Sequence, residues 1–444
     1  MNFLVKLLKY ICVFIILILS YNLLLNLVSL FPSSIIYANC LKSAIRLDKE
    51  KGFYFVVPPY FVDNWTDSLI INEAYSIDNS SPTESYLKVR KNYCPATIYE
   101  LPDMIGELST YSENKFDENN MPVPDTDYNI IKELYNTLNN NSYISPSYTR
   151  YYHGYLVLFR PLLIFFDIIG IRTLLFICFI ILFIIFAIKM YKTLGKQYMF
   201  AFCISLIAFD FFATSYSLQQ SLVLVITIVT SIIILSHYQK LPWDKMTLLL
   251  FVVGSITNYF DFLTAPTLTL ALPLLIYVLC KTKEEKYSNK ELFLNVIKVC
   301  IMWSIGYAFT WISKWVICNL LIDSQTLKSA IEQINYRSVG EIANHSRIIL
   351  MLEHCFVLID WHIIIAFILE FIYRKKHKRN NVAPFNINNK LVLAFVCTIP
   401  IFWSIITKNH FYYHIYFTYK NLIGLSILFF LLFIEAEERV KSLK

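Results

Sequence analysis

The sequence lacks the short motifs by which many soluble enzymes bind metals, nucleotides or acyl substrates. It contains no CxxC pair and no HExxH pattern, which argues against a zinc or redox centre built on those motifs. It also has no GxGxxG, P-loop or GxSxG sequence. A nucleotide-dependent enzyme on the cytoplasmic side is therefore unsupported, and we expect no nucleotide cofactor.

Long apolar runs dominate the chain instead. Its 444 residues are 57% hydrophobic, against roughly 45–50% in soluble domains. A membrane-spanning helix needs about 20 mainly apolar residues. The sequence therefore predicts an all-α polytopic membrane protein with about ten transmembrane helices. We place them at residues 8–30, 172–189, 198–213, 218–236, 246–262, 264–280, 292–318, 347–372, 390–407 and 421–436.

One long polar segment interrupts this series. After the first transmembrane helix (1–30), residues 31–150 hold most of the Asp, Asn, Ser and Pro and cannot lie in hydrocarbon. Residues 151–169 are apolar but broken by Arg160, Pro161 and Asp167. We predict an interfacial helix there; the alternative is one longer, kinked second span. Residues 170–444 form the multi-span transmembrane domain.

The placement of basic residues predicts the orientation of the spans. The net charge of +7 would be compatible with nucleic-acid binding, but the lysines and arginines cluster in short loops between apolar runs, so we expect no nucleic-acid partner. With ten spans and a cytoplasmic N-terminus, every strongly basic short segment falls on the cytoplasmic side. Both termini are then cytoplasmic, and the polar segment 31–150 is extracytoplasmic.

Two aspartates early in this outer loop are the candidate catalytic residues. Asp63 and Asp67 are four residues apart in the sequence DNWTD and would share a face of a helix. Two such carboxylates repel unless a cation or substrate group lies between them or one is protonated, an arrangement that suits a general base or a metal ligand. The alternative is a helix-capping turn, for which the same sequence is well suited. Glu73 could extend the face.

Further polar residues fall on the same predicted side and are candidate substrate-binding residues. Asp210 and Asp261 lie at the outer ends of the third and fifth spans, where they line a cavity or cap helix ends. Arg160 and Arg337 would clamp a phosphate or anchor the interface.

The last outer loop, KNHFYYHIYFTYK, has the densest cationic and imidazole cluster, made of Lys408, His410, His414 and Lys420. Such groups suit a phosphate or pyrophosphate. The alternative is an interfacial aromatic belt. His410 and His414 have the i, i+4 spacing of helix-borne metal ligands, but the sequence identifies no metal.

The layout of a first span, a long outer loop with an early acidic pair, and many further spans resembles the GT-C superfamily of membrane glycosyltransferases. Local matches are DNWTD, RYYHGYLVLFRPLL, YFDFLTAP and KNHFYYHIYFTYK. The resemblance implies a bacterial plasma-membrane enzyme that transfers sugar from a polyprenyl-phosphate donor to an extracytoplasmic acceptor, a cell-envelope glycan, lipid or protein. It maps the family's first-loop acid to Asp63 or Asp67. Many members have DxD or ExD there, whereas this pair is spaced D-x3-D, which leaves a divalent metal open.

Two other classes remain as alternatives. A transporter or flippase of envelope precursors would favour polar sites at the membrane midplane, broken helices and internal repeats. Pro266, Pro273 and Pro400 do interrupt spans, but no repeat is visible and the acidic residues gather on one side. A polysaccharide polymerase or ligase would share the outer-face site and transfer a whole chain.

Overall fold

The structure, a computed structural model, describes residues 3–50, 53–57, 60–89, 111–116, 122–124, 130–139, 148–261, 263–284, 287–322, 325–339, 368 and 389–431. Helices predominate among them. Within these ranges, five helices are long and apolar enough to cross a membrane, by length and composition: Leu4–Ser29, Ile168–Thr193, Lys196–Tyr216, Leu218–Lys240 and Asn289–Leu321. The prediction of a helical protein with membrane-spanning segments is thus confirmed at this level. The predicted span 347–372, apart from Ile368, lies outside the described residues, as do the loop residues 90–110 and 140–147.

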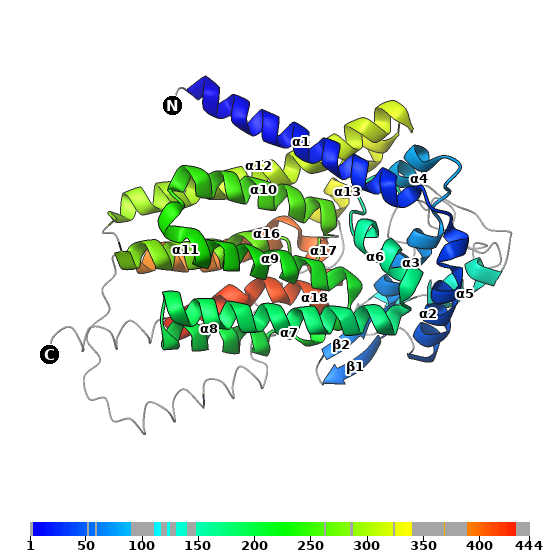
Figure 1. Ribbon diagram of the computed structural model, residues 1–444, viewed down its shortest axis with the longest axis horizontal. Helices are drawn as coiled ribbons and strands as arrows, with labels where there is room; N and C mark the ends of the chain where they lie inside the picture. Colours follow the sequence, from blue (N-terminus) through cyan, green and yellow to red (C-terminus); the bar gives the residue numbers. More distant parts are fainter. Residues whose placement is uncertain are drawn as a thin grey trace.

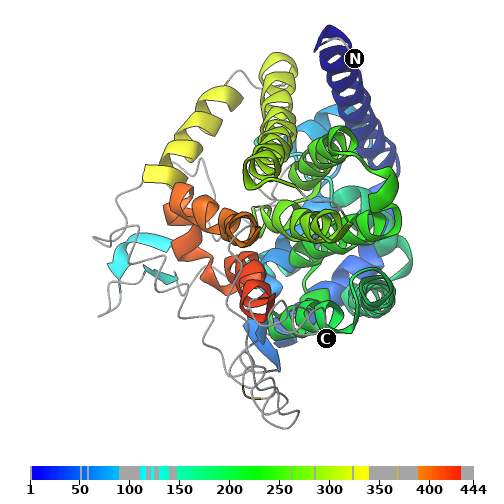
Figure 2. The ribbon, with the colours of Figure 1, turned by 90° about the vertical axis from the view of Figure 1, so that its left-hand side faces the viewer.

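The long helices lie side by side and form one bundle (Figures 1 and 2). Their bounds follow the predicted spans closely, because each apolar run ends at a polar or Gly/Pro-containing turn. They are α1 (Phe3–Ser29), α7 (Ile168–Thr193), α8 (Lys196–Ala208), α9 (Leu218–His237), α10 (Trp243–Phe260), α11 (Leu268–Glu284), α12 (Asn289–Leu321) and α16 (Lys390–Ile406).

The polar segments gather at one end of the bundle, where they form a unit that we call the cap (Figure 1). The cap consists of α2 (Tyr37–Glu50), α3 (Asn64–Tyr75), α4 (Pro82–Lys88), α5 (Ile130–Asn139), α6 (Leu156–Phe165) and the antiparallel hairpin of β1 (Phe53–Val57) and β2 (Tyr60–Asp63). A second antiparallel pair joins β3 (Tyr111–Phe116) to β4 (Pro122–Pro124).

Short elements connect the bundle helices. At the cap end these are η3 (Ala213–Tyr216), α13 (Thr326–Val339), α17 (Lys408–Tyr413), α18 (Ile415–Thr418) and η5 (Tyr419–Leu422), which leads into an apolar helix to Leu431. At the opposite end, η4 (Tyr238–Lys240) precedes α10. The chain thus brings the residues between consecutive helices to alternating ends of the bundle, as the basic-residue pattern predicts.

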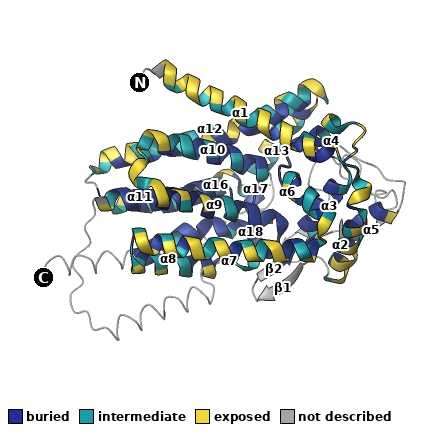
Figure 3. Cartoon of the chain, in the orientation of Figure 1, coloured by how far each residue is buried: buried dark blue, intermediate teal, exposed yellow. Residues whose placement is uncertain are grey.

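Many large hydrophobic side chains are exposed on the outer helices of the bundle, whose exposed positions are marked in Figure 3. Leu19 of α1 is 65% exposed and Ile181 of α7 is 52% exposed. Leucine and isoleucine side chains exposed in such number along whole helices are unfavourable in water but suit contact with lipid. This surface supports the assignment of the bundle to a membrane on grounds independent of helix length.

Two glycines set the closest helix pairing in the bundle. A Cβ at Gly254 of α10 would lie 2.2 Å from the carbonyl oxygen of Trp303, and one at Gly306 of α12 would lie 2.1 Å from that of Phe251. Neither position has room for a side chain. Small residues allow helix backbones to approach in membranes, so these two glycines fix the contact between α10 and α12.

The predicted interfacial segment 151–169 divides into two parts. Residues 148–155 are non-helical and buried, and the amide of Gly154 donates to the carbonyl of Tyr259 at 2.9 Å. The helix α6 begins only at Leu156, and it exposes Leu158 and Phe165 at its surface. The tyrosines of the first part pack inward against the bundle, which a surface helix would not allow.

Candidate functional site

Asp63 caps α3. Its Oδ1 accepts a hydrogen bond from the amide of Thr66 at 3.0 Å, and its Oδ2 accepts from the Thr66 hydroxyl at 2.5 Å. The side chain has no exposed surface. Burial raises the pKa of Asp63, and the hydrogen bonds from Thr66 act in the opposite direction. The ion pairs formed by the described residues do not include this carboxylate, so its direct partners are neutral.

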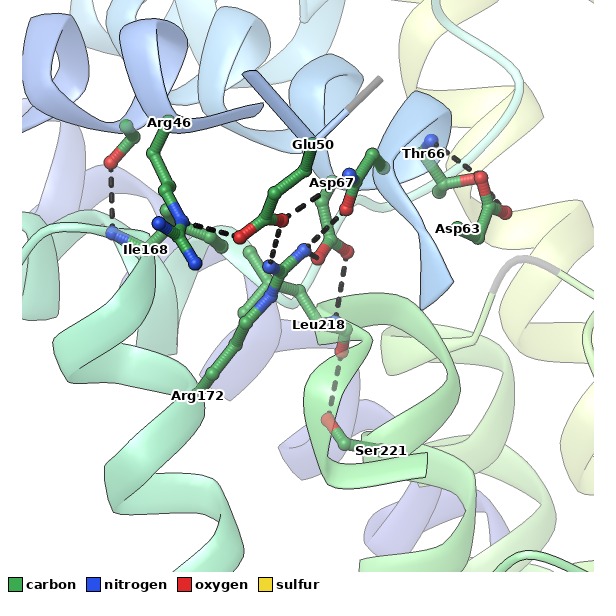
Figure 4. A network of polar contacts seen from close by, with 11 residues as sticks. Arg46, Glu50, Asp63, Thr66, Asp67, Ile168, Arg172, Leu218 and Ser221 are labelled. Atoms are coloured by element: carbon green, nitrogen blue, oxygen red, sulfur yellow. Dashed lines mark hydrogen bonds and ion pairs between the residues drawn. The ribbon is translucent and has the colours of Figure 1, made fainter. Parts of the chain in front are cut away.

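Asp67, in the first turn of α3, belongs to a buried ion-pair network (Figure 4). Its Oδ2 lies 2.8 Å from Nη2 of Arg172, at the start of α7. The same nitrogen donates to Oδ1 of Asn64 at 2.7 Å, and Nη1 of Arg172 lies 2.9 Å from Oε2 of Glu50. The Oδ1 of Asp67 accepts from the amide of Leu218, the first residue of α9, at 2.9 Å. One guanidinium therefore joins α2 and α3 of the cap to α7.

The charges of this network nearly balance. Glu50 also pairs with Arg46, which is half exposed, so two guanidinium groups face two carboxylates. Burial raises the pKa of Asp67 to about 6; Arg172 lowers it, and the nearby charge of Asp63 raises it. A nearby cation is one of the alternatives that the sequence leaves open for the acidic pair, and the structure has Arg172 beside Asp67, which sequence reasoning missed. The sequence did offer one signal: Arg172 lies at the outer end of a predicted span, whereas most basic residues fall on the cytoplasmic side.

A second predicted group lies around His410. Its Nε2 is 2.8 Å from the carbonyl oxygen of Leu263, and its Nδ1 is 2.6 Å from Nη1 of Arg337. A carbonyl only accepts and a guanidinium only donates, so His410 is neutral with its proton on Nε2. Burial and the charge of Arg337 lower the pKa of His410 well below its ordinary value. The ring of His414 lies 4.6 Å away, centroid to centroid. Arg337 and the two histidines therefore form one cluster.

The remaining predicted residues each have contacts of their own. Lys420 is buried and donates to Oε1 of Gln220 at 2.8 Å. The hydroxyl of the neighbouring Tyr419 donates to Asp210. Asp261 accepts from the amide of Thr264 at 3.1 Å and so caps the turn before α11. Lys408 is half-buried at the first residue of α17.

The first turn of α9 connects the two predicted groups. Its first residue, Leu218, donates its amide to Asp67. Two positions later, Gln220 accepts from Lys420. Asp67 of the first loop and Lys420 of the last loop, more than 340 positions apart in the sequence, thus both contact the first turn of α9. We take the cap end around this turn as the candidate site.

Arg160 lies apart from this site and ties segments together. It is fully buried, and Nε donates to the carbonyl of Val28 at 2.9 Å while Nη2 donates to that of Phe31 at 2.6 Å. Nη1 donates to the carbonyl of Ala74 and, at 3.3 Å, to the hydroxyl of Ser33. All three nitrogens are thus engaged by the ends of α1 and α3 and the turn between α1 and α2.

Glu73 belongs to a different cluster from Asp67. It accepts a hydrogen bond from the hydroxyl of Tyr155, which lies 2.6 Å from Nδ1 of His153. Glu73 and His153 are 3.3 Å apart and form a buried ion pair when His153 is charged. His153 Nε2 faces the carbonyl of Tyr148 at 3.1 Å. Sequence reasoning did not select His153 or Tyr155, because nothing in YYHGY shows that a carboxylate from α3 meets them.

No cluster of three or more His, Cys, Asp or Glu side chains that could hold a metal occurs among the described residues. Comparisons of the chain with protein-family models, curated proteins and solved structures find no match. The function is therefore argued from the residues of the cap end.

Proposed function

We propose that the chain is a ten-span GT-C-type membrane glycosyltransferase. It transfers a sugar from a polyprenyl-phosphate donor to an acceptor of the cell envelope, on the extracytoplasmic side of a bacterial plasma membrane, where the cap lies. Both termini are cytoplasmic. The observation that supports the proposal is the first turn of α9, which contacts Asp67 of the first loop and Lys420 of the last loop.

Of the two candidate acids, Asp63 is the better base. Both oxygens of Asp67 already accept hydrogen bonds, one from Arg172 and one from the Leu218 amide, so neither is available to accept a proton from a substrate. Asp63 contacts only neutral donors, and burial raises its pKa toward the range in which a general base works well. Asp63 has no exposed surface, so the acceptor hydroxyl must displace its neighbours to reach it.

In the proposed reaction, Asp63 takes the proton of the acceptor hydroxyl while the acceptor oxygen bonds to the anomeric carbon. The bond from that carbon to the donor phosphate breaks, and the polyprenyl phosphate leaves with the electron pair. Displacement inverts the anomeric configuration. Lys420 and Arg337 would supply the positive charge that stabilises the leaving phosphate.

The decisive variant is Asp63→Asn, because asparagine caps a helix as well as aspartate does but cannot accept the proton. In cells that lack the native copy, wild-type protein restores the envelope glycan and lipid profile. Asp63→Asn at equal abundance does not restore it. If Asp63→Asn and Asp67→Asn both restore the wild-type profile, the proposal is wrong.

A further inference from the structure

Three arginines of the described chain are deeply buried, and one of them differs from the others. Arg160 is engaged through all three nitrogens by main-chain carbonyls and a hydroxyl, and Arg172 by two carboxylates and an amide. Arg150 is 6% exposed, and only its Nη1 donates, to the Ser329 hydroxyl at 3.0 Å. Within the described chain, its Nε and Nη2 are buried without a hydrogen-bond partner.

Contacts to both its main chain and its guanidinium fix the position of Arg150. Its carbonyl accepts from the indoles of Trp311 and Trp315, each at 2.9 Å. Its guanidinium carbon lies 5.2 Å from the centroid of the Tyr148 ring. The residue is therefore fixed between α12, α13 and the buried segment 148–155.

The two nitrogens without partners lie on the same edge of the planar guanidinium. The N–H groups of Nε and Nη2 point in parallel, which is the geometry that binds two oxygens of a carboxylate or a phosphate. No Asp or Glu of the described chain forms an ion pair with Arg150. A buried charge without a counter-charge is unfavourable, so an anion bound to this edge would stabilise Arg150.

We propose that Arg150 binds a phosphate group through its Nε and Nη2, so that this buried edge is a phosphate site between the cap, α12 and α13. The phosphate belongs either to a lipid head group or to a soluble phosphate compound. The proposal stands independently of the transferase proposal, because it rests on an arginine that the proposed reaction does not use.

The test measures binding to the full-length chain purified in detergent. The probes are inorganic pyrophosphate in solution and phosphatidic acid in mixed micelles, with phosphatidylcholine micelles as the neutral control. Arg150→Gln removes the charge, and Arg150→Lys keeps the charge but removes the parallel N–H pair. Lys42→Gln, at an exposed cation of the cap, controls for unspecific attraction.

We expect wild type and Lys42→Gln to bind at least one probe with similar dissociation constants. Both Arg150 variants should bind it about tenfold to a hundredfold more weakly, the loss expected from charge-assisted hydrogen bonds. Binding of pyrophosphate alone indicates a soluble ligand, and binding of phosphatidic acid alone indicates a lipid. If wild type binds neither probe, or if Arg150→Lys binds as tightly as wild type, the proposal is wrong. Because the first outcome needs only wild-type protein, the test holds even if Arg150→Gln fails to fold.

Discussion

Asp67 and Arg172, 105 positions apart in the sequence, form a buried ion pair at 2.8 Å across the junction between the cap and the helix bundle. Arg172 also holds Glu50 and Asn64, so a single side chain connects two cap helices to α7. Fixing the position of α3 in this way also fixes Asp63, which caps the same helix. The relationship yields a stability prediction and a catalytic one.

Breaking this pair should destabilise the protein strongly. Arg172→Met leaves the buried carboxylate of Asp67 without a cation and should lower the free energy of unfolding by about 3–5 kcal/mol. Asp67→Asn leaves Arg172 still paired with Glu50, so its loss should be smaller. In the double variant the remaining charge is absent, so the combined loss should be smaller than the sum. Unfolding of the detergent-solubilised chain measures both quantities. Additive losses would contradict an interaction between the two side chains.

Substitutions of Asp63 should separate capping from chemistry. Asparagine keeps an oxygen that accepts from the Thr66 amide, so Asp63→Asn should change the free energy of unfolding by only a few tenths of a kcal/mol, about the difference between good caps. Asp63→Ala removes the cap and should cost about 1 kcal/mol. If unfolding shows that Asp63→Asn is as unstable as Asp63→Ala, the carboxylate has a structural role beyond the cap.

Acid should destabilise the protein through His410. The folded state holds His410 neutral, with its pKa well below the ordinary 6.5. Above pH 6.5, the His410 side chain is neutral in both the folded and the unfolded chain. Below it only the unfolded chain takes up the proton, so stability falls by at most about 1.4 kcal/mol per pH unit.

The measurement is the difference in unfolding free energy between wild type and His410→Gln from pH 7.5 to 5. Taking this difference cancels the contributions of groups that titrate in the same way in both proteins. One of these is Asp67, whose raised pKa acts in the opposite direction, removing stability as the pH rises from about 4 to about 6. A difference that stays constant over this range would show that His410 is not held neutral.

The contact between α10 and α12 should tolerate no side chain. Gly254→Ala places a methyl group 2.2 Å from the Trp303 carbonyl oxygen, so the helices must separate, at a cost of about 1–3 kcal/mol or more. Gly424→Ala is the matched control, since its nearest atom is 3.3 Å away, and its loss should be smaller. Thermal unfolding of both variants decides the point, and equal losses would contradict this packing.

The sequence predicted the fold at the level of helices and their order. Apolar runs of the right length fix where helices form, and the residues at the starts of α9 and α16 were predicted at positions 218 and 390, where the structure has them. The number of spans stays a prediction, because residues 347–372, apart from Ile368, lie outside the described chain.

The site was less predictable, because its contacts are between residues far apart in the chain. Spacing suggested that Asp63 and Asp67 share a helix face, whereas Asp63 precedes the helix as its cap and Asp67 faces Arg172. Arg150 begins the quoted segment RYYHGYLVLFRPLL, but no pattern selected its side chain, since an arginine at a loop end is ordinary until burial shows that it lacks a counter-charge. A basic residue at the outer end of a span, such as Arg172, departs from the usual distribution and would have indicated that it has buried acidic partners.

The central claim is that the cap end transfers sugar from a polyprenyl-phosphate donor with Asp63 as the base. Its most direct test uses lipid-linked sugars extracted from cells that lack the protein, incubated with purified wild type or Asp63→Asn together with an envelope acceptor fraction. We predict that wild type releases free polyprenyl phosphate, measured by mass spectrometry, and that Asp63→Asn, equally stable, releases at least a hundredfold less, at the lower end of the roughly 10²–10⁴-fold effect of a general base. No release by wild type, or equal release by both proteins, would contradict the account.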